Sequence, residues 1–137
     1  MDGYKFVDDL TSDVMFEAYG KDLREVFTNA AIAMFSVICK LDKVKGKETR
    51  SVEVGGKGRE ELLINWLQHL IGLVDTDGLF FSRFEILEID DFHLKAKVHG
   101  EGIRPELGET VVKAVTYYGF RLEKTDKGYL ARVSLDI

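Results

Sequence analysis

Two stretches of the chain have apolar residues at every third or fourth position, which is the pattern of a helix with one buried face. The first stretch covers residues 22–40 and the second covers residues 62–74. Asp22 can accept hydrogen bonds from the first turn of the first helix, and Glu25 can reach back in a capping-box-like arrangement. The Asp-Thr-Asp-Gly sequence at 75–78 suits the exit of the second helix. Both helices need an apolar surface to pack on.

The rest of the chain has the alternation and the turn signals of strands. The clearest strand is 92–98, in which apolar residues alternate with histidine and lysine, so one face is expected to be buried. Short polar turns separate this strand from the preceding one, and also separate the last two strands, which predicts two hairpins. The other predicted strands cover residues 14–19, 51–54, 79–89, 115–122 and 129–135.

This order of elements predicts the fold class. A strand, a helix, a strand, a helix and four further strands favour an α+β fold, a two-layer sandwich of a mostly antiparallel sheet with the two main helices packed on one face. The length of 137 residues is that of one compact domain, 1–137. No internal repeat, linker or low-complexity tract divides it.

Charge and cysteine content narrow the function classes. The 24 acidic residues exceed the 19 basic ones, and the net charge of −5 disfavours direct binding to nucleic acid, so any role with RNA is expected to be indirect. The single cysteine, Cys39, cannot form an internal disulfide, and the N-terminus lacks a secretion signal. No run reaches the about 18 apolar residues that would span a membrane, so we expect a cytoplasmic protein.

The chain contains none of the common catalytic signatures, such as a nucleophile elbow, a zinc-protease helix motif or a phosphate-binding loop. The glycine-rich turn at 55–58 could meet an anion and residues 75–78 could start a calcium loop, but neither spacing is right. His93 and His99 share a strand face about 20 Å apart, too far for one metal, and are expected to be surface residues. Cys39 is expected to be a packing or surface residue. No catalytic residue is predicted.

The N-terminal region carries a family resemblance. Asp9, Thr11, Asp13 and Val14, followed by Glu-Ala-Tyr-Gly at 17–20, are similar to the archease opening, which reads approximately D-H-T-A-D-V before a short strand. Further similar segments follow in the expected order and cover essentially the whole chain, at residues 29–35, 61–67, 81–84, 113–117 and 133–137. Leu10 and Tyr118 depart from the family pattern, because each stands where archeases commonly have a histidine.

The resemblance implies a non-enzymatic protein cofactor. Archeases assist the tRNA-splicing RNA ligase, which joins RNA ends with GTP and metal, through its guanylylation step and repeated turnover. The resemblance also implies a metal site made of the Asp13 and Asp136 side chains and Ile137, through its main chain or terminal carboxylate. These are hard oxygen ligands, which suit Ca²⁺ first and Mg²⁺ second. Without the resemblance, the two aspartates would be read as solvated surface residues.

Other interpretations stay open. Lys113 and Thr116 are polar positions within an apolar strand and are candidates for partner binding, although a wet strand face needs no function. The protein could instead be a chaperone or a specificity modulator of a tRNA-modifying enzyme such as a methyltransferase. A metal-dependent hydrolase would need a general base or nucleophile near the ion, and the sequence identifies neither.

Overall fold

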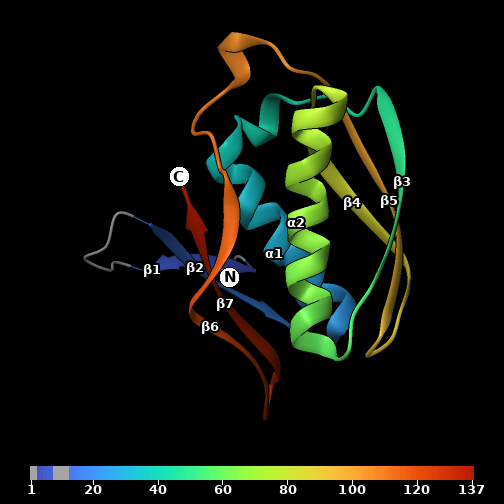
Figure 1. Ribbon diagram of the computed structural model, residues 1–137, viewed down its shortest axis with the longest axis vertical. Coiled ribbons are helices and arrows are strands. Elements are labelled where there is room, and N and C mark those ends of the chain that lie inside the picture. The colour runs from blue at the N-terminus through green and yellow to red at the C-terminus, as the bar shows by residue number, and fades with distance from the viewer. Residues whose placement is uncertain (1–2, 8–12) are drawn as a thin grey trace.

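The computed structural model describes residues 3–7 and 13–137, and these form helices and strands in the order shown in Figure 1. The strands are β1 (Tyr4–Val7), β2 (Val14–Gly20), β3 (Glu48–Gly55), β4 (Leu79–Ile89), β5 (His93–Gly102), β6 (Ala114–Thr125) and β7 (Gly128–Asp136). The helices are α1 (Leu23–Ile38) and α2 (Arg59–Asp77), with short 3-10 turns at Leu41–Lys43 and Pro105–Leu107. No helix in the described ranges combines the length and the apolarity that crossing a membrane requires.

The described strands form two antiparallel sheets, ordered β1-β2-β7-β6 and β3-β5-β4. Both helices contact strands of both sheets: α1 lies mainly on β2 and β4, and α2 on β6 and β3. The predicted α+β class is therefore confirmed. The division of the strands between two sheets, and the edge strand β1, were not predicted, because alternation identifies the buried face of a strand but not its neighbour.

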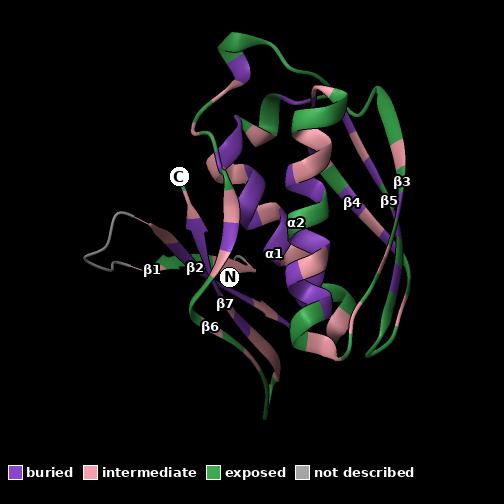
Figure 2. Cartoon of the chain, in the orientation of Figure 1, coloured by how far each residue is buried: buried purple, intermediate pink, exposed green. Residues whose placement is uncertain are grey.

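The buried residues lie between the helices and the two sheets, as Figure 2 shows. Trp66 of α2 is fully buried, and its indole N–H donates to the carbonyl of Phe27 on α1 at 3.1 Å. This hydrogen bond satisfies the one polar atom of the Trp66 side chain and connects the two helices. The largest fully buried side chains are Trp66, Phe16, Phe27, Phe35, Phe81, Met34, Leu62, Leu63, Leu67, Leu70, Leu94 and Leu135.

The helix ends follow the predicted chemistry. Asp22 is the N-cap of α1 and accepts from the backbone N–H of Glu25 at 2.9 Å. The Glu25 carboxylate accepts in turn from the N–H of Lys21 at 3.0 Å, one residue earlier than a standard capping box. Helix α2 ends at Gly78, whose φ of 65° lies in the left-handed region that glycine adopts without strain.

Candidate metal and partner site at the end of β7

The first sheet brings the start of β2 beside the end of the chain. Val14 pairs with Leu135 in the antiparallel register of β2 and β7. Continuing that register by one residue places Asp13 across from Asp136, and Ile137 follows directly. The three residues that the resemblance assigns to a metal site therefore belong to the same end of two neighbouring strands, and Figure 1 marks the C-terminus there.

The alternation of β7 decides which face of the sheet carries the aspartates. Val133 and Leu135 are fully buried in the main core, which also holds the α1 side chains. Because successive strand side chains point to opposite faces, Ser134 and Asp136 lie on the face away from that core. The same alternation along β2, in register with β7, assigns Asp13 to this outer face.

Strand β6 brings the two candidate partner-binding residues to the same end of β7. The backbone N–H of Lys113 donates to the carbonyl of Asp136 at 2.7 Å, and Ala114 pairs with Asp136. Thr116 pairs with Ser134, so its side chain is on the outer face with Asp136. The Oγ1 atom of Thr116 is buried and has no hydrogen-bond partner among the described residues. A buried hydroxyl of this kind normally has a partner, such as a water molecule.

A large bulge in β6 adds two exposed aromatic residues to this site. Pairing with β7 breaks off after Thr116 and resumes at Arg121. Within the bulge, Tyr117 is 72% and Tyr118 52% exposed, and the Tyr118 carbonyl accepts from the Ser134 hydroxyl at 2.8 Å. Tyr118 stands where the archease motif commonly has a histidine. The sequence signal for the bulge is Gly119, whose φ of 63° breaks a regular strand.

A buried ion pair lies on the same outer face, farther along β2 and β7. Glu17 is only 7% exposed and accepts from the guanidinium of Arg132 at 2.6 and 3.0 Å. The Tyr19 hydroxyl also donates to Glu17 at 3.0 Å, and the Lys5 ammonium lies 3.6 Å away. Burial raises the pKa of Glu17, but the hydrogen bonds from Arg132 and Tyr19 and the nearby cations outweigh burial and leave the pKa below its ordinary value. Sequence reasoning missed this pair, since its members are 115 residues apart.

The other polar candidates do not form a second site. Cys39 is buried, and burial, together with the nearby Glu109 carboxylate, raises the pKa of its thiol to about 12, as a packing role predicts. His93 is exposed, as expected, whereas His99 is partly covered: its side chain is 15% exposed and bonded to Thr49 and Glu85. Its polar neighbours on β3 and β4 cover it, and cross-strand neighbours cannot be identified from alternation alone.

Within residues 3–7 and 13–137, no three or more His, Cys, Asp or Glu side chains gather to hold a metal. The site implied by the resemblance contains only two such side chains, with the chain end as its third member. Leu10, the other departure from the archease motif, lies outside the described residues.

These features define a class of small α+β proteins in which two helices lie between two antiparallel sheets and the last strand is central in one sheet. The sequence model of the archease protein family matches residues 4–137. The chain therefore belongs to the archease family.

Individual relatives agree with this assignment. The archease of Methanosarcina acetivorans is 43% identical over 93% of this chain and 91% of its own length. That of Methanothermobacter thermautotrophicus is 40% identical over the full length of both chains. The solution structure of protein 1598 of Methanobacterium thermoautotrophicum superposes with a TM-score of 0.83 at 39% identity, covering all of both chains.

A more distant structure shows how far the fold extends. A crystal structure from Thermotoga maritima, described as an archease and possible chaperone, superposes with a TM-score of 0.69 and covers 96% of this chain and 95% of its own. Its sequence is only 17% identical, so the likeness shows the shared fold alone.

Proposed function

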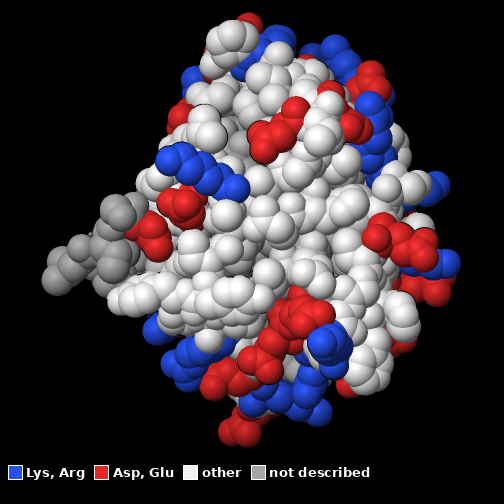
Figure 3. All heavy atoms as spheres, in the orientation of Figure 1, with Lys and Arg blue, Asp and Glu red and all other residues white. Residues whose placement is uncertain are grey.

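We propose that this protein is a non-enzymatic cofactor that activates the GTP-dependent tRNA-splicing RNA ligase, promoting guanylylation and multiple turnover with the help of a bound divalent metal. Membership of the archease family supports the RNA ligase as the partner. The register of β2 and β7 supports the metal site, because it brings two carboxylates and the chain end to one place. The protein would act in the cytoplasm and meet RNA only through its partner. Acidic and basic side chains are intermixed on the face that Figure 3 shows.

The donor set fits a hard cation. The side chains of Asp13 and Asp136 and the main chain or terminal carboxylate of Ile137 offer only oxygen atoms, which Ca²⁺ and Mg²⁺ prefer. Ca²⁺ takes about six to eight oxygen ligands and tolerates irregular geometry, so waters or groups of the partner would complete its shell. The Thr116 hydroxyl, which has no hydrogen-bond partner among the described residues, lies on the same face and would hydrogen-bond such a water.

The bound ion would supply positive charge for phosphate or carboxylate groups of the partner complex. The chain's own residues would hold it: β2 and β6 flank β7 and fix Asp136 on both sides, through the Val14–Leu135 pairing and the Lys113 hydrogen bond. Lys113, Thr116 and the exposed Tyr117 and Tyr118 surround this end of β7 and would contact the ligase.

Calorimetric titration of Ca²⁺ and Mg²⁺ tests the metal site. Tag-free protein is compared with a form extended by a few residues beyond Ile137, in which the terminal carboxylate becomes an amide, and with Asp136→Asn. We expect both changes to weaken Ca²⁺ binding at least about tenfold, because each removes a charged ligand. Asp126→Asn, in the turn between β6 and β7, is the charge-matched control and should bind as the wild type does. Unchanged affinity in the extended form would remove the chain end from the site.

Ligase assays test the partner separately. Stoichiometric guanylylation and multiple-turnover joining by the purified cognate RNA ligase are measured with wild-type protein, Asp13→Asn and the Asp126→Asn control. Loss of stimulation with Asp13→Asn alone is the expected result. Stimulation by Asp13→Asn equal to that by wild type would refute a role for the metal while leaving the partner in place. If the wild-type protein does not stimulate the ligase, the proposal that the ligase is its partner is refuted.

A chaperone or specificity modulator of a tRNA-modifying enzyme, such as a methyltransferase, is the second candidate. It is compatible with membership of the archease family, and a Thermotoga maritima protein of the same fold is described as an archease and possible chaperone. In this case the protein would change the aggregation or the site selectivity of the modifying enzyme, and Asp13→Asn would act as well as wild type. Measurement of both activities with the same protein preparations distinguishes the two candidates.

A further inference from the structure

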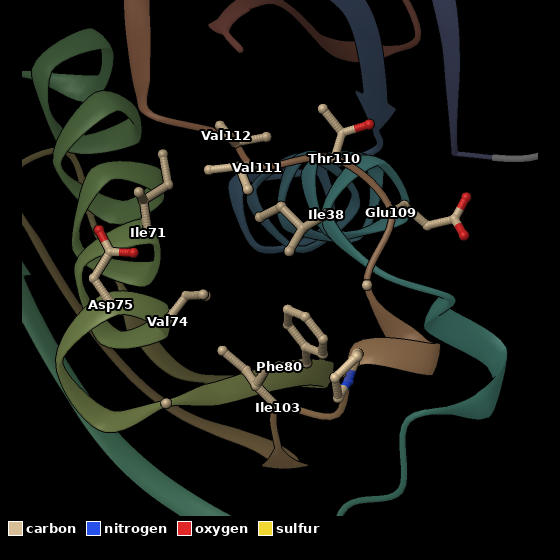
Figure 4. Close-up of a pocket in the computed structure, with 13 residues that line it drawn as sticks. Ile38, Ile71, Val74, Asp75, Phe80, Ile103, Glu109, Thr110, Val111 and Val112 are labelled. Carbon is tan, nitrogen blue, oxygen red and sulfur yellow. The ribbon is translucent and has the colours of Figure 1, made fainter.

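An apolar pocket lies between the C-terminal ends of α1 and α2, where the segment 103–112 crosses them (Figure 4). Its volume is about 570 Å³, within the range of roughly 300 to 1,000 Å³ that is typical of ligand sites. The charged residues that line it are Asp75 and Glu109, and no lysine or arginine does so. The apolar part of the wall includes Ile38, Ile71, Val74, Phe80, Ile103 and Val111.

Backbone hydrogen bonds fix the walls of this pocket. The N–H groups of Glu109 and Thr110 donate to the carbonyls of Ile38 and Val37 at 2.9 and 3.1 Å, which satisfies the last turn of α1. On the opposite side, the N–H of Ile103 donates to the carbonyl of Gly78 at 2.9 Å. These bonds hold the backbone of the segment 103–112 on both sides of the pocket, which limits the ordering that binding would require.

The rim of the pocket exposes apolar surface that the fold does not use. Val111 is 77% exposed and Ile103 is 44% exposed, and both line the opening. Apolar side chains grouped around a concave site mark a binding surface more clearly than single exposed residues do.

One carboxylate at the rim lacks a counterion. Asp75 lies beside Ile71 and Val74 on α2 (Figure 4), and no cation of the described residues pairs with it. Glu109 points away from the pocket in the same view, and its carboxylate lies 3.9 Å from the Lys40 ammonium. The mouth of the pocket therefore carries one uncompensated negative charge beside apolar side chains, which is complementary to an apolar group with a neighbouring cation.

We propose that this pocket is a docking site for a short segment of a partner protein, which inserts an aliphatic side chain and places an adjacent lysine or arginine against Asp75. The charge of the chain favours this occupant over the alternatives. A second copy of the chain, with its net charge of −5, and a nucleic acid would both be repelled, whereas a basic protein surface would be attracted. The pocket is separate from the metal ligands, so its test requires neither the metal nor the ligase.

Titration of ¹⁵N-labelled protein with blocked dipeptides, followed by amide chemical shifts, tests this docking site. The probes are acetyl-Leu-Lys-amide, acetyl-Leu-Glu-amide and acetyl-Gly-Lys-amide. We expect saturable shifts at the pocket residues with the Leu-Lys probe, at least about threefold weaker binding of the Leu-Glu probe, and no saturation with the Gly-Lys probe. Asp75→Asn should bring the affinities of the Leu-Lys and Leu-Glu probes within about twofold of each other.

A pocket-filling variant tests the location. An added Cβ at Gly108 would lie 3.6 Å from the Pro105 carbonyl and 3.7 Å from the Phe80 ring, which are ordinary contacts, so Gly108→Leu extends into the pocket without a backbone clash. This variant should fold and lose the Leu-Lys shifts. Gly58→Leu, where an added Cβ meets nothing within 4 Å, is the matched control and should retain them.

Three results would overturn the proposal. The first is the absence of saturation with the Leu-Lys probe up to about 20 mM, which would mean binding too weak for a specific docking site. The second is equal binding of the Leu-Lys and Leu-Glu probes to the wild type. The third is full binding by Gly108→Leu, which would place the interaction elsewhere.

Discussion

The ion pair between Glu17 and Arg132 is expected to contribute to the stability of the fold, and this contribution can be measured. The variant Arg132→Met removes the guanidinium and keeps most of the aliphatic stem, leaving Glu17, only 7% exposed, with Tyr19 and Lys5 as its remaining partners. Breaking a fully buried pair costs about 3 to 5 kcal/mol. Because the Arg132 side chain is 31% exposed and Lys5 remains, we expect a smaller loss at pH 7, about 2 kcal/mol of unfolding free energy.

The pH dependence separates charge from packing. The pKa of Glu17 is lowered in the folded protein, so the ionised carboxylate stabilises the fold above its ordinary value of 4.5, and this contribution is lost as the pH falls through the lower folded pKa. The effect of Arg132→Met on the unfolding free energy should therefore be smaller near pH 3 than at pH 7. The variant Glu17→Gln has no carboxylate at residue 17 to ionise. It should therefore lose most of the difference in unfolding free energy between pH 7 and pH 3 that Glu17 causes.

Urea unfolding followed by the fluorescence of the single tryptophan, Trp66, measures both quantities, because this residue is fully buried in the core. Near pH 7 the melting temperature should also fall by roughly 6 to 8 °C. The control is Arg121→Met, which breaks the Arg121–Glu123 pair of 2.7 Å between half-exposed side chains and should cost less than about 0.5 kcal/mol. A loss from Arg132→Met that is equal at both pH values would refute the electrostatic explanation and leave only packing.

Two further predictions concern the second sheet and the core. An added Cβ at Gly100 would overlap the Phe80 carbonyl, so Gly100→Ala should destabilise the protein by about 2 to 4 kcal/mol in urea unfolding, whereas Gly102→Ala, with nothing within 4 Å, should change it by less than about 1 kcal/mol. Cys39, with a pKa raised to about 12 by burial and by Glu109, should not react with a thiol reagent at about pH 8 until urea unfolds the protein; reaction in the native state at the rate of the unfolded chain would contradict its burial.

The two helices could be predicted from the sequence because the residues that indicate them are close together along the chain. Asp22 caps the first helix as predicted, and Gly78 ends the second, whose last turn reaches Asp77 and so extends past the predicted end before Asp75. The pairing of strands is not local. Alternation in 92–98 indicates that one face is buried, but it does not reveal that β5 pairs with β3 and β4 in a sheet separate from β7.

The candidate metal residues followed from family resemblance, and the described structure adds their arrangement. Asp13 and Asp136 are 123 positions apart in the sequence, and only the register of β2 against β7 brings them to the same end of a sheet. The bulge that carries Tyr118 was not predicted from the sequence. The residues before and after it both have the alternating pattern of a strand, and one glycine between them does not reveal that the pairing is interrupted. The signal that could have revealed it is the Tyr-Tyr-Gly sequence ending at Gly119.

The position of β7 would favour the proposed metal site, because the end of this strand is held on both sides. Terminal residues usually fray, and binding an ion with a frayed end costs conformational entropy. Here β7 is a central strand with β2 on one side and β6 on the other, Leu135 is fully buried, and the Asp136 carbonyl accepts from Lys113 at 2.7 Å. The strand is therefore held up to the residue before Ile137. An ion bound through the terminal carboxylate would need to order one residue, while added residues beyond it would remove a charge from an otherwise fixed position.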